Sequence, residues 1–161
     1  MALEIRWPQK YEPGRVRVHV RNQLSMQAPA SAVWAWLIRA QKWPEWYVNS
    51  SNVVFPDSSG PDLSLGVQFR WRTFGVAIES KVEEFVERER IAWSARGVGV
   101  DAYHAWAIEE NRQGCVVLTE ETQHGWVAGL GRLLMPNRMH RFHQIWLESL
   151  DKQARSGFPS P

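Results

Sequence analysis

An alternation of apolar and polar residues between Gly66 and Gln123 is the feature that most constrains the fold. The stretches GVQFRWRTF, GVAIESKVEEF, IAWSA and DAYHAWAIEE place apolar side chains at every second position, and short turns separate them. CVVLTEETQ is apolar on both faces at its start, so its register stays open, and we expect Val117, Thr119 and Glu121 to point inward. Successive side chains of a strand point to opposite faces, so this period indicates half-buried strands. The short connections favour antiparallel pairing in one sheet. RVRVHVRNQLSM, nearer the N-terminus, predicts a further strand with the same period.

Helical patterns flank this run of strands. APASAVWAWLIRA carries Pro29 at a position suited to a first helical turn, and PEWYVNS predicts a second short helix or turn. WVAGLGRLLMPNRMHRFHQIWLESLDKQA has helical periodicity, and Pro136 should kink it or separate a first turn from the main helix. We therefore predict an α+β fold, in which about seven curved antiparallel strands wrap around a long C-terminal helix. Two short helices would close one end, and the sheet and helix would enclose an internal hydrophobic cavity.

The chain of 161 residues has the length of one domain. We expect that domain over residues 15–154, with an N-terminal extension at 1–14 and a flexible tail at 155–161. A soluble, cytoplasmic protein is expected, because 44% of the residues are apolar without a membrane-spanning run or a secretory signal. The single cysteine, Cys115, excludes an internal disulfide framework and fits a buried strand position.

The partners expected from composition are few. The net charge is +2 and no block of Lys or Arg stands out, so nucleic acid is not an expected partner. The pattern leaves open a monomer or a homodimer. Ten tryptophans are present, and Trp34, Trp36, Trp43 and Trp46 lie within thirteen residues of one another. So many indoles indicate either an aromatic core or an aromatic-lined cavity, and composition does not choose between the two.

The motif VRVHVRNQLSMQAPASAVWAWLIRAQKWPEW resembles the opening of a known superfamily. GVQFRWRTFGVAIESKVEEF, ERERIAWSARG and HAWAIEENRQGCVVLTEE extend the likeness over roughly residues 15–154. The superfamily is the START-related, birch-pollen-allergen-like one (SRPBCC), in its bacterial polyketide cyclase/dehydrase branch. Gly114-Cys115 departs from it, since members more often have Gly-Thr there. The resemblance implies a helix-grip fold, whereas its members range from cyclases to lipid carriers and hormone receptors.

The resemblance also implies positions for individual residues. Ala28-Pro29 would end the first strand, Val33 and Leu37 would pack the first helix inward, and Trp46 would close the narrow end of the cavity. We interpret the other three tryptophans of the opening stretch as packing residues.

Positions that alternate inward predict an aromatic wall for a small hydrophobic ligand. Polar groups on the same faces would orient that ligand, and Asn22 is expected among them. The candidate ligand-binding residues are Trp46, Phe69, Trp71, Ser80, Trp93, Trp106, Thr119, Met139, Phe142 and Trp146.

His104, Glu121 and Arg138 are the candidate catalytic residues. One hypothesis pairs Arg138 with Glu121 across the cavity, while His104 acts on a ligand oxygen as a general acid or base. The alternative places Arg138 at the cavity mouth, turns Glu121 outward through a register slip in strand 115–124, and makes His104 a core imidazole.

No metal or cofactor is predicted. His140 and His143 are spaced i, i+3, but they lie well away from the predicted apolar stripe of the last helix and lack an HExxH motif. We expect both to be exposed to solvent. Helical spacing predicts that this stripe consists of Met135, Met139, Phe142, Ile145, Trp146 and Leu150.

Three functions follow from these patterns. The first is a carrier or binding protein for a small hydrophobic molecule: aromatic, polyketide-like or lipid. The second is a polyketide aromatase/cyclase or dehydratase that uses the polar residues of the cavity as acid and base. The third is a non-catalytic interaction domain whose interior is filled by its own tryptophans.

Overall fold

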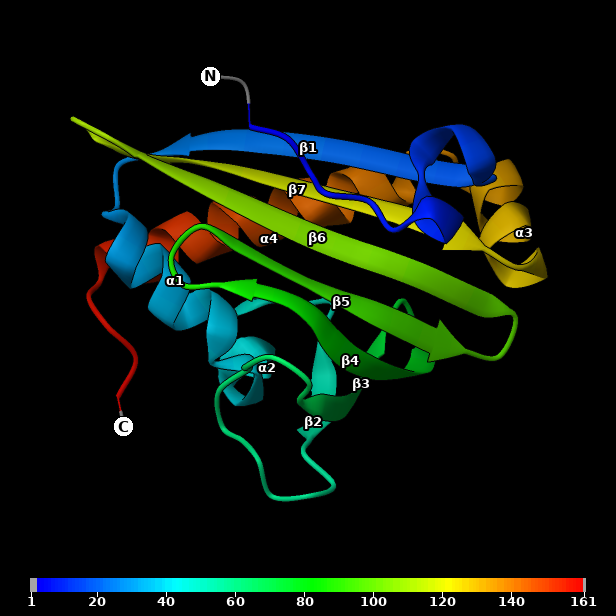
Figure 1. The fold of residues 1–161 in the computed structure, drawn as a ribbon, viewed down its shortest axis with the longest axis horizontal. Coiled ribbons are helices and arrows are strands. Elements are labelled where there is room, and N and C mark those ends of the chain that lie inside the picture. The colour runs from blue at the N-terminus through cyan, green and yellow to red at the C-terminus, as the bar shows by residue number, and fades with distance from the viewer. Residues whose placement is uncertain (1–2, 161) are drawn as a thin grey trace.

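Seven antiparallel strands form one curved sheet in the computed structural model, which describes residues 3–160 (Figure 1). The order across the sheet is β1-β7-β6-β5-β4-β3-β2, so the last strand returns beside the first. The predicted number and direction of the strands are confirmed. The strands are β1 (Val18–Met26), β2 (Ser51–Val54), β3 (Gln68–Thr73), β4 (Val76–Val86), β5 (Arg90–Gly97), β6 (Val100–Asn111) and β7 (Gly114–His124).

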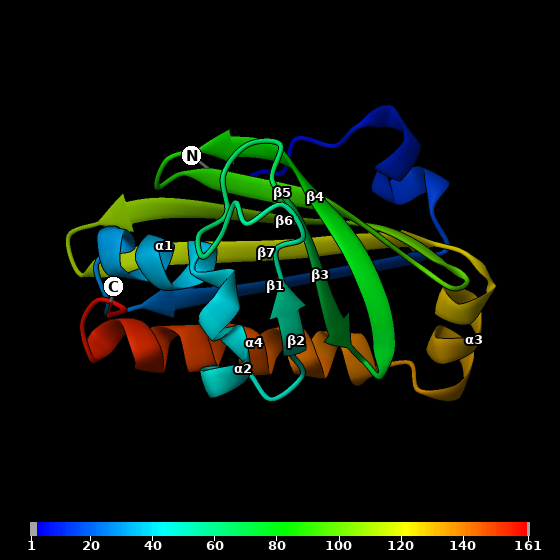
Figure 2. The same cartoon turned by 90° about the horizontal axis from the view of Figure 1, so that it is seen from below.

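The helices close the concave side of this sheet. The long helix α4 (Arg138–Arg155) runs along the sheet, with α1 (Ala30–Ile38) and α2 (Trp43–Trp46) toward one end and α3 (Trp126–Leu134) at the other (Figure 2). This arrangement confirms the predicted helix-grip fold. Three single 3-10 turns complete the description: η1 (Gln9–Tyr11), η2 (Pro13–Arg15) and η3 (Ala40–Lys42).

Pro136 separates α3 from α4, as predicted. Proline has no N–H to donate and its ring clashes with the preceding turn, so helical hydrogen bonding stops there. The segment before the break is a full nine-residue helix rather than a single turn. Over residues 3–160, no helix is both long and apolar enough to span a membrane.

The register of β7 decides which side chains enter the interior. Thr119 lies opposite Trp106 and Glu121 lies opposite His104 in the β6–β7 ladder. The predicted inward positions of Thr119 and Glu121 are therefore confirmed, and the register slip is excluded. The neighbouring outward positions Leu118 and Thr122 are buried as well. Burial on both faces explains why the apolar alternation is lost at the start of this strand.

The segment before β1 covers part of the outer face of the sheet (Figure 1). Tyr11 stacks on Tyr103 with ring centroids 5.2 Å apart, and its hydroxyl donates a hydrogen bond to Asp101 at 2.6 Å. Lys10 forms an ion pair with the same carboxylate. The N-terminal residues thus bury the outward side chains of β6 and are integrated into the fold.

The chain after α4 lies against α1. The carbonyl oxygen of Gly157 accepts a hydrogen bond of 2.7 Å from the indole Nε1 of Trp36, and the Ser160 carbonyl accepts one from Arg39. The flexibility expected of residues 155–161 stays a prediction, and Pro161 lies outside the described residues.

Candidate functional site

One half of the interior is filled by aromatic rings around Trp43. This side chain is fully buried, and its ring centroid lies 5.2 Å from that of Trp146, 5.3 Å from Trp71 and 5.5 Å from Trp93. Its indole Nε1 donates to the Leu37 carbonyl at 3.0 Å, which satisfies the one polar atom of the ring. Trp43 is therefore a core residue, as interpreted from the sequence.

The other half of the interior is a cavity of about 470 Å³. One wall is aromatic, with Trp71, Trp93 and Trp146. Helix α3 forms the cavity wall at one end of the molecule, through side chains that include Val127 and Ala128. Its volume lies within the range typical of small-molecule sites, which are mostly apolar with a few polar groups.

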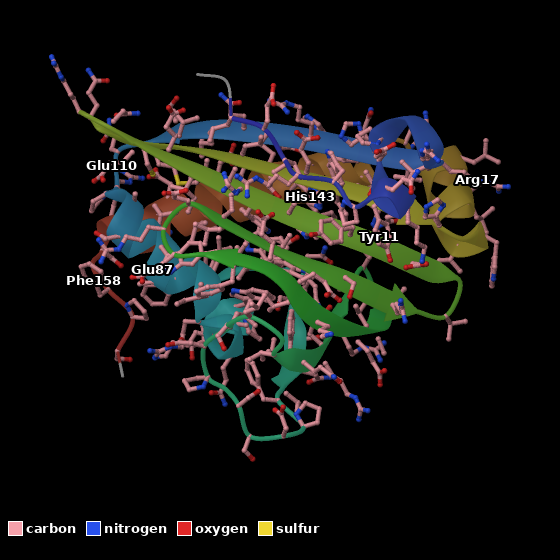
Figure 3. The ribbon with its side chains drawn as sticks, in the orientation of Figure 1. Tyr11, Arg17, Glu87, Glu110, His143 and Phe158 are labelled. Carbon is pink, nitrogen blue, oxygen red and sulfur yellow. The ribbon has the colours of Figure 1, made fainter. Side chains whose placement is uncertain are left out.

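His104, Glu121 and His143 form a buried polar cluster on the wall of this cavity. They come from β6, β7 and α4, and Figure 3 labels His143 where α4 passes behind the strands. One carboxylate oxygen, Glu121 Oε2, lies 3.0 Å from His143 Nε2 and 3.4 Å from His104 Nδ1. The two imidazoles stack with centroids 4.8 Å apart and an interplanar angle of 13°. Three separate elements thus converge on one carboxylate.

Further contacts hold the cluster in place. Thr119 Oγ1 lies 2.7 Å from His104 Nε2, within hydrogen-bonding distance. Gln123 Nε2 donates to Glu121 Oε1 at 2.5 Å. His104 also packs between the rings of Trp93 and Trp106, with centroids at 5.0 and 5.2 Å. Each ring and the carboxylate therefore have packing or hydrogen-bonding neighbours on several sides.

Burial sets the charge state of His104. Removal from water lowers the pKa of this imidazole to about 3, although the Glu121 carboxylate acts in the opposite direction. His104 is consequently neutral at pH 7. Burial alone would raise the pKa of Glu121, but the two imidazoles and the Gln123 amide outweigh that effect and hold it below its usual range. Glu121 is therefore an anion that accepts hydrogen bonds.

The charge on Glu121 defines the roles of the His143 nitrogens. A carboxylate only accepts hydrogen bonds, so His143 Nε2 is the donor in the 3.0 Å contact. In the neutral ring, Nδ1 then carries a lone pair, and this buried atom has no partner among residues 3–160. The indole nitrogens of Trp93 and Trp146 are likewise buried without a partner in that part of the chain. Residues that line the cavity thus carry one acceptor and two donors that are buried and have no partner in the described part of the chain.

His104, Glu121 and His143 are also residue types that bind metals, and each offers one ligand atom within 4.8 Å of the others. The nearly parallel stacking of the two rings bears on this possibility. Lone pairs of imidazole nitrogens lie in the ring planes, so those of two parallel, stacked rings do not meet at one point. In this arrangement the three residues form a hydrogen-bonded cluster.

The predicted ligand-binding residues divide into two groups. Four of them line the cavity: Trp71, Trp93, Met139 and Trp146. The other six lie outside its wall: Trp46, Phe69, Ser80, Trp106, Thr119 and Phe142.

Most of the second group have structural contacts instead. Ser80 Oγ accepts a hydrogen bond of 3.1 Å from Trp71 Nε1, and Phe142 packs edge-on against Phe74. Trp46 packs against Trp36 with centroids 6.5 Å apart and is partly buried against the hydrophobic core. Asn22 donates from Nδ2 to the His140 carbonyl and to Gln144, and so joins β1 to α4.

Arg138 does not pair with Glu121, which corrects the first hypothesis. Its guanidinium lies over the ring of Phe74, 5.3 Å from the centroid, and it is partly exposed at the cavity wall. Long cationic side chains extend toward water when no buried partner compensates their desolvation. The position of Arg138 agrees with the alternative that placed it at the cavity mouth.

The expectation that His143 is exposed was wrong, since only 1% of its surface is accessible. The buried residues of α4 are His143, Trp146, Leu147, Leu150 and Ala154, which recur at helical spacing. Trp146 and Leu150 of the predicted stripe are buried, but Met135 lies before α4 begins, and the other three members are only half-buried. A stripe anchored on Leu147, Leu150 and Ala154 would have placed His143 inward.

Comparison with solved structures supports the fold. Hypothetical protein jhp0584 from Helicobacter pylori is 30% identical, with a TM-score of 0.89 over 96% of this chain and 98% of that chain. The di-domain ARO/CYC StfQ from the steffimycin biosynthetic pathway is 14% identical, with a TM-score of 0.70 over 86% of this chain and 51% of that chain. Ara h 8.0201 is 10% identical, with a TM-score of 0.66 over 87% and 99%.

A search of the curated proteins finds no match. The family model described as "Polyketide cyclase / dehydrase and lipid transport" matches residues 17–155. This match covers the sheet from β1 to β7, both helices that border the cavity, and the His104–Glu121–His143 cluster. The chain belongs to the polyketide cyclase/dehydrase and lipid transport family.

Proposed function

We propose that this protein binds a small, largely apolar molecule that carries at least one hydroxyl and one carbonyl oxygen. One observation supports this proposal most: three buried polar atoms without a partner in residues 3–160 belong to residues that line an apolar cavity of about 470 Å³. The three atoms are buried, so a ligand would reach them only after a local shift of the cavity wall. His143 Nδ1 would then accept a hydrogen bond from a hydroxyl, and the indole nitrogens of Trp93 and Trp146 would donate to a carbonyl. Unpaired buried polar groups cost free energy, which such a ligand would recover.

The shape and lining of the cavity favour an aromatic or polyketide-like ligand over a fatty acid. Three indoles offer flat surfaces against which a planar ring system can stack. Fused phenolic ketones combine planarity with the required donor and acceptor. The family description, which includes polyketide cyclases, agrees with this ligand class.

A pair of probes tests the proposal. Naphthalene and 2-naphthol have the same ring system, and only 2-naphthol can donate a hydroxyl to His143 Nδ1. Quenching of tryptophan fluorescence should saturate with both compounds, and we expect 2-naphthol to bind roughly tenfold more tightly, as befits one buried hydrogen bond.

His143→Phe serves as the matched variant, because phenylalanine retains an aromatic ring and removes both nitrogens. It should bind naphthalene as the unaltered protein does and lose the preference for 2-naphthol. Arg141→Phe, at an exposed position of the same helix that does not line the cavity, is the control and should keep the preference. Absence of a saturable fluorescence change with either compound would refute binding in this cavity.

The Glu121–His143 contact supports a second function, cyclisation or dehydration. Glu121 orients His143 through Nε2 and leaves Nδ1 as a base. In an aldol condensation, Nδ1 would remove a proton from the carbon beside a carbonyl, and that carbon would attack a second carbonyl carbon. The imidazolium would return its proton to the new alkoxide. A second α-proton would then leave with the hydroxyl, which departs as water.

A simple 1,5-diketone tests this chemistry, since its cyclisation and loss of water form a conjugated enone that absorbs in the ultraviolet. His143→Phe should lower the rate of enone formation by about 100-fold or more, as expected for loss of a general base. Naphthalene binding should be retained in that variant, which separates loss of the base from loss of the cavity. A rate equal to that in buffer would exclude the cyclase for this substrate class.

A further inference from the structure

Helix α3 presents an apolar face to solvent. Trp126, Leu130, Leu133 and Leu134 follow one another at helical spacing and are 66%, 48%, 77% and 67% exposed. The opposite face of the same helix, with Ala128 and Gly131, lines the cavity. A surface helix of a globular domain ordinarily has a polar outer face. Since α3 is apolar on both sides, its outer face requires a partner.

The apolar surface continues onto the turn between β5 and β6. Val98, at the tip of this turn, is 80% exposed. The Gly99 carbonyl accepts a hydrogen bond of 3.1 Å from the Val127 N–H, so the turn is joined to α3. A Cβ atom at Gly99 would lie 2.7 Å from the indole nitrogen of Trp126, which shows how closely the two segments pack. We call Val98, Trp126, Leu130, Leu133 and Leu134 the α3 patch.

The charges around the α3 patch are positive. Residues 125–147 contain no Asp or Glu, but they contain Arg132, Arg138 and Arg141. Arg17 is labelled beside α3 in Figure 3, and its guanidinium lies 3.9 Å from the position that a Cβ atom at Gly129 would take. No residue within 3–160 forms an ion pair with any of these four guanidinium groups.

We infer that the α3 patch docks on an anionic lipid bilayer. Interfacial helices insert an apolar face into the headgroup region, where tryptophan is favoured, and nearby cations attract anionic lipids. A second copy of the chain fits less well, because a two-fold contact through this face would bring the same unpaired arginines toward one another. Docking would place α3 between the bilayer and the cavity and would give apolar ligands a short path between them.

Vesicle flotation tests this inference. The full chain is mixed at low ionic strength with vesicles of phosphatidylcholine alone, or with vesicles that contain 30% phosphatidylglycerol. We expect at least about tenfold stronger partition onto the anionic vesicles, and we expect 0.5 M NaCl to abolish the difference. Acyl chains labelled with bromine should quench Trp126, so Trp126→Phe should lose most of the quenching.

The double variant Leu133→Glu/Leu134→Glu should no longer bind the anionic vesicles. Val48→Glu, an exposed apolar position near α2, is the matched control and should still bind. Naphthalene titration of each variant in the absence of vesicles reports the cavity separately, so failure of docking and failure of ligand binding are distinguishable. Equal partition onto both vesicle types, or no partition onto either, would overturn the inference. So would a dimeric mass in light scattering that Leu133→Glu/Leu134→Glu converts to a monomer.

Discussion

The two halves of the interior lie under the same sheet and beside the same helix, yet one is filled and the other is open. At the end near α1 and α2, Trp43 occupies the space between α4 and the sheet, and its ring contacts three other indoles. At the α3 end, small residues such as Ala95 and Ala102 line the cavity, and α3 itself contributes Ala128 and Gly131. The sheet and α4 enclose the whole interior, and the volumes of the side chains that enter it determine which part stays empty.

The boundary between the halves is where the polar cluster lies. Trp93 and Trp146 contact Trp43 on one side and line the cavity on the other. His104 packs against both of them. The filled half thus acts as a rigid support for the groups that face the open half, in the way that packed residues behind a binding site hold it in place.

Removal of Trp43 should have the largest effect. Trp43→Ala leaves a large cavity in the filled half and should lower the free energy of unfolding by about 3–5 kcal/mol. Chemical denaturation measures this change. Trp126→Ala removes the same side chain from an exposed site and should change stability by less than about 0.5 kcal/mol. If Trp43→Ala lowered the free energy of unfolding as little as Trp126→Ala does, the aromatic packing around Trp43 would contribute little to stability.

The pH dependence of stability tests the buried cluster. Burial depresses the pKa of His104 from 6.5 to about 3 in the folded protein. As the pH falls below 6.5, the unfolded chain binds a proton that the folded protein does not, so stability decreases progressively down to about pH 3. The low pKa of Glu121 acts with the same sign, since its stabilisation is present above the ordinary carboxyl pKa and is lost toward about pH 2.

Denaturation curves between pH 7 and pH 4 measure this slope. His104→Leu should flatten it, because the titrating imidazole is gone from both the folded and the unfolded states. His140→Leu removes an exposed histidine from α4 and should leave the slope as it is. Stability that does not vary over this range in the unaltered protein would contradict a neutral, buried His104.

Filling the open half should affect binding more than stability. Ala102→Phe adds a ring at the cavity wall and should weaken naphthalene binding at least about tenfold, equivalent to roughly 1.4 kcal/mol. Its effect on the free energy of unfolding should be smaller than that of Trp43→Ala. The same change at an exposed turn, Val98→Phe, should leave cavity binding intact. Unchanged affinity in Ala102→Phe would place the ligand elsewhere.

The smallest expected effect on stability concerns the segment after α4, which packs against α1 beside the filled half of the interior. Trp36→Phe removes the hydrogen bond from the indole nitrogen to the Gly157 carbonyl and should cost about 1 kcal/mol. In a chain that ends at Ser156 the same substitution should cost less, because its partner is already absent. Additive losses in the double variant would show that the tail is not docked in solution, and would support the flexibility predicted for it.

Much of this arrangement was predictable from the sequence. Period-two alternation is a local property, so it correctly assigned Trp71, Trp93, His104 and Glu121 to the inner face of the sheet. Pro136 predicted the break between α3 and α4 for an equally local reason. The motifs of the first strand and helix indicated the family, which the match over residues 17–155 confirms.

Only the tertiary structure decided which inward residues meet a cavity. The rotation of α4 about its own axis depends on its packing along the whole sheet. The predicted stripe ran from Met135, which lies before α4 begins, to Leu150, and it placed His143 on the wrong side. The predicted pairing of Arg138 with Glu121 was wrong, because Arg138 lies over Phe74 instead. The distance between two residues on opposite sides of the interior cannot be read from a local sequence pattern. Strand alternation determines which side chains point inward because neighbouring residues alone set it. Whether the space they enter is filled depends on the volumes of residues far apart in the chain, which meet only when the sheet closes on the helix.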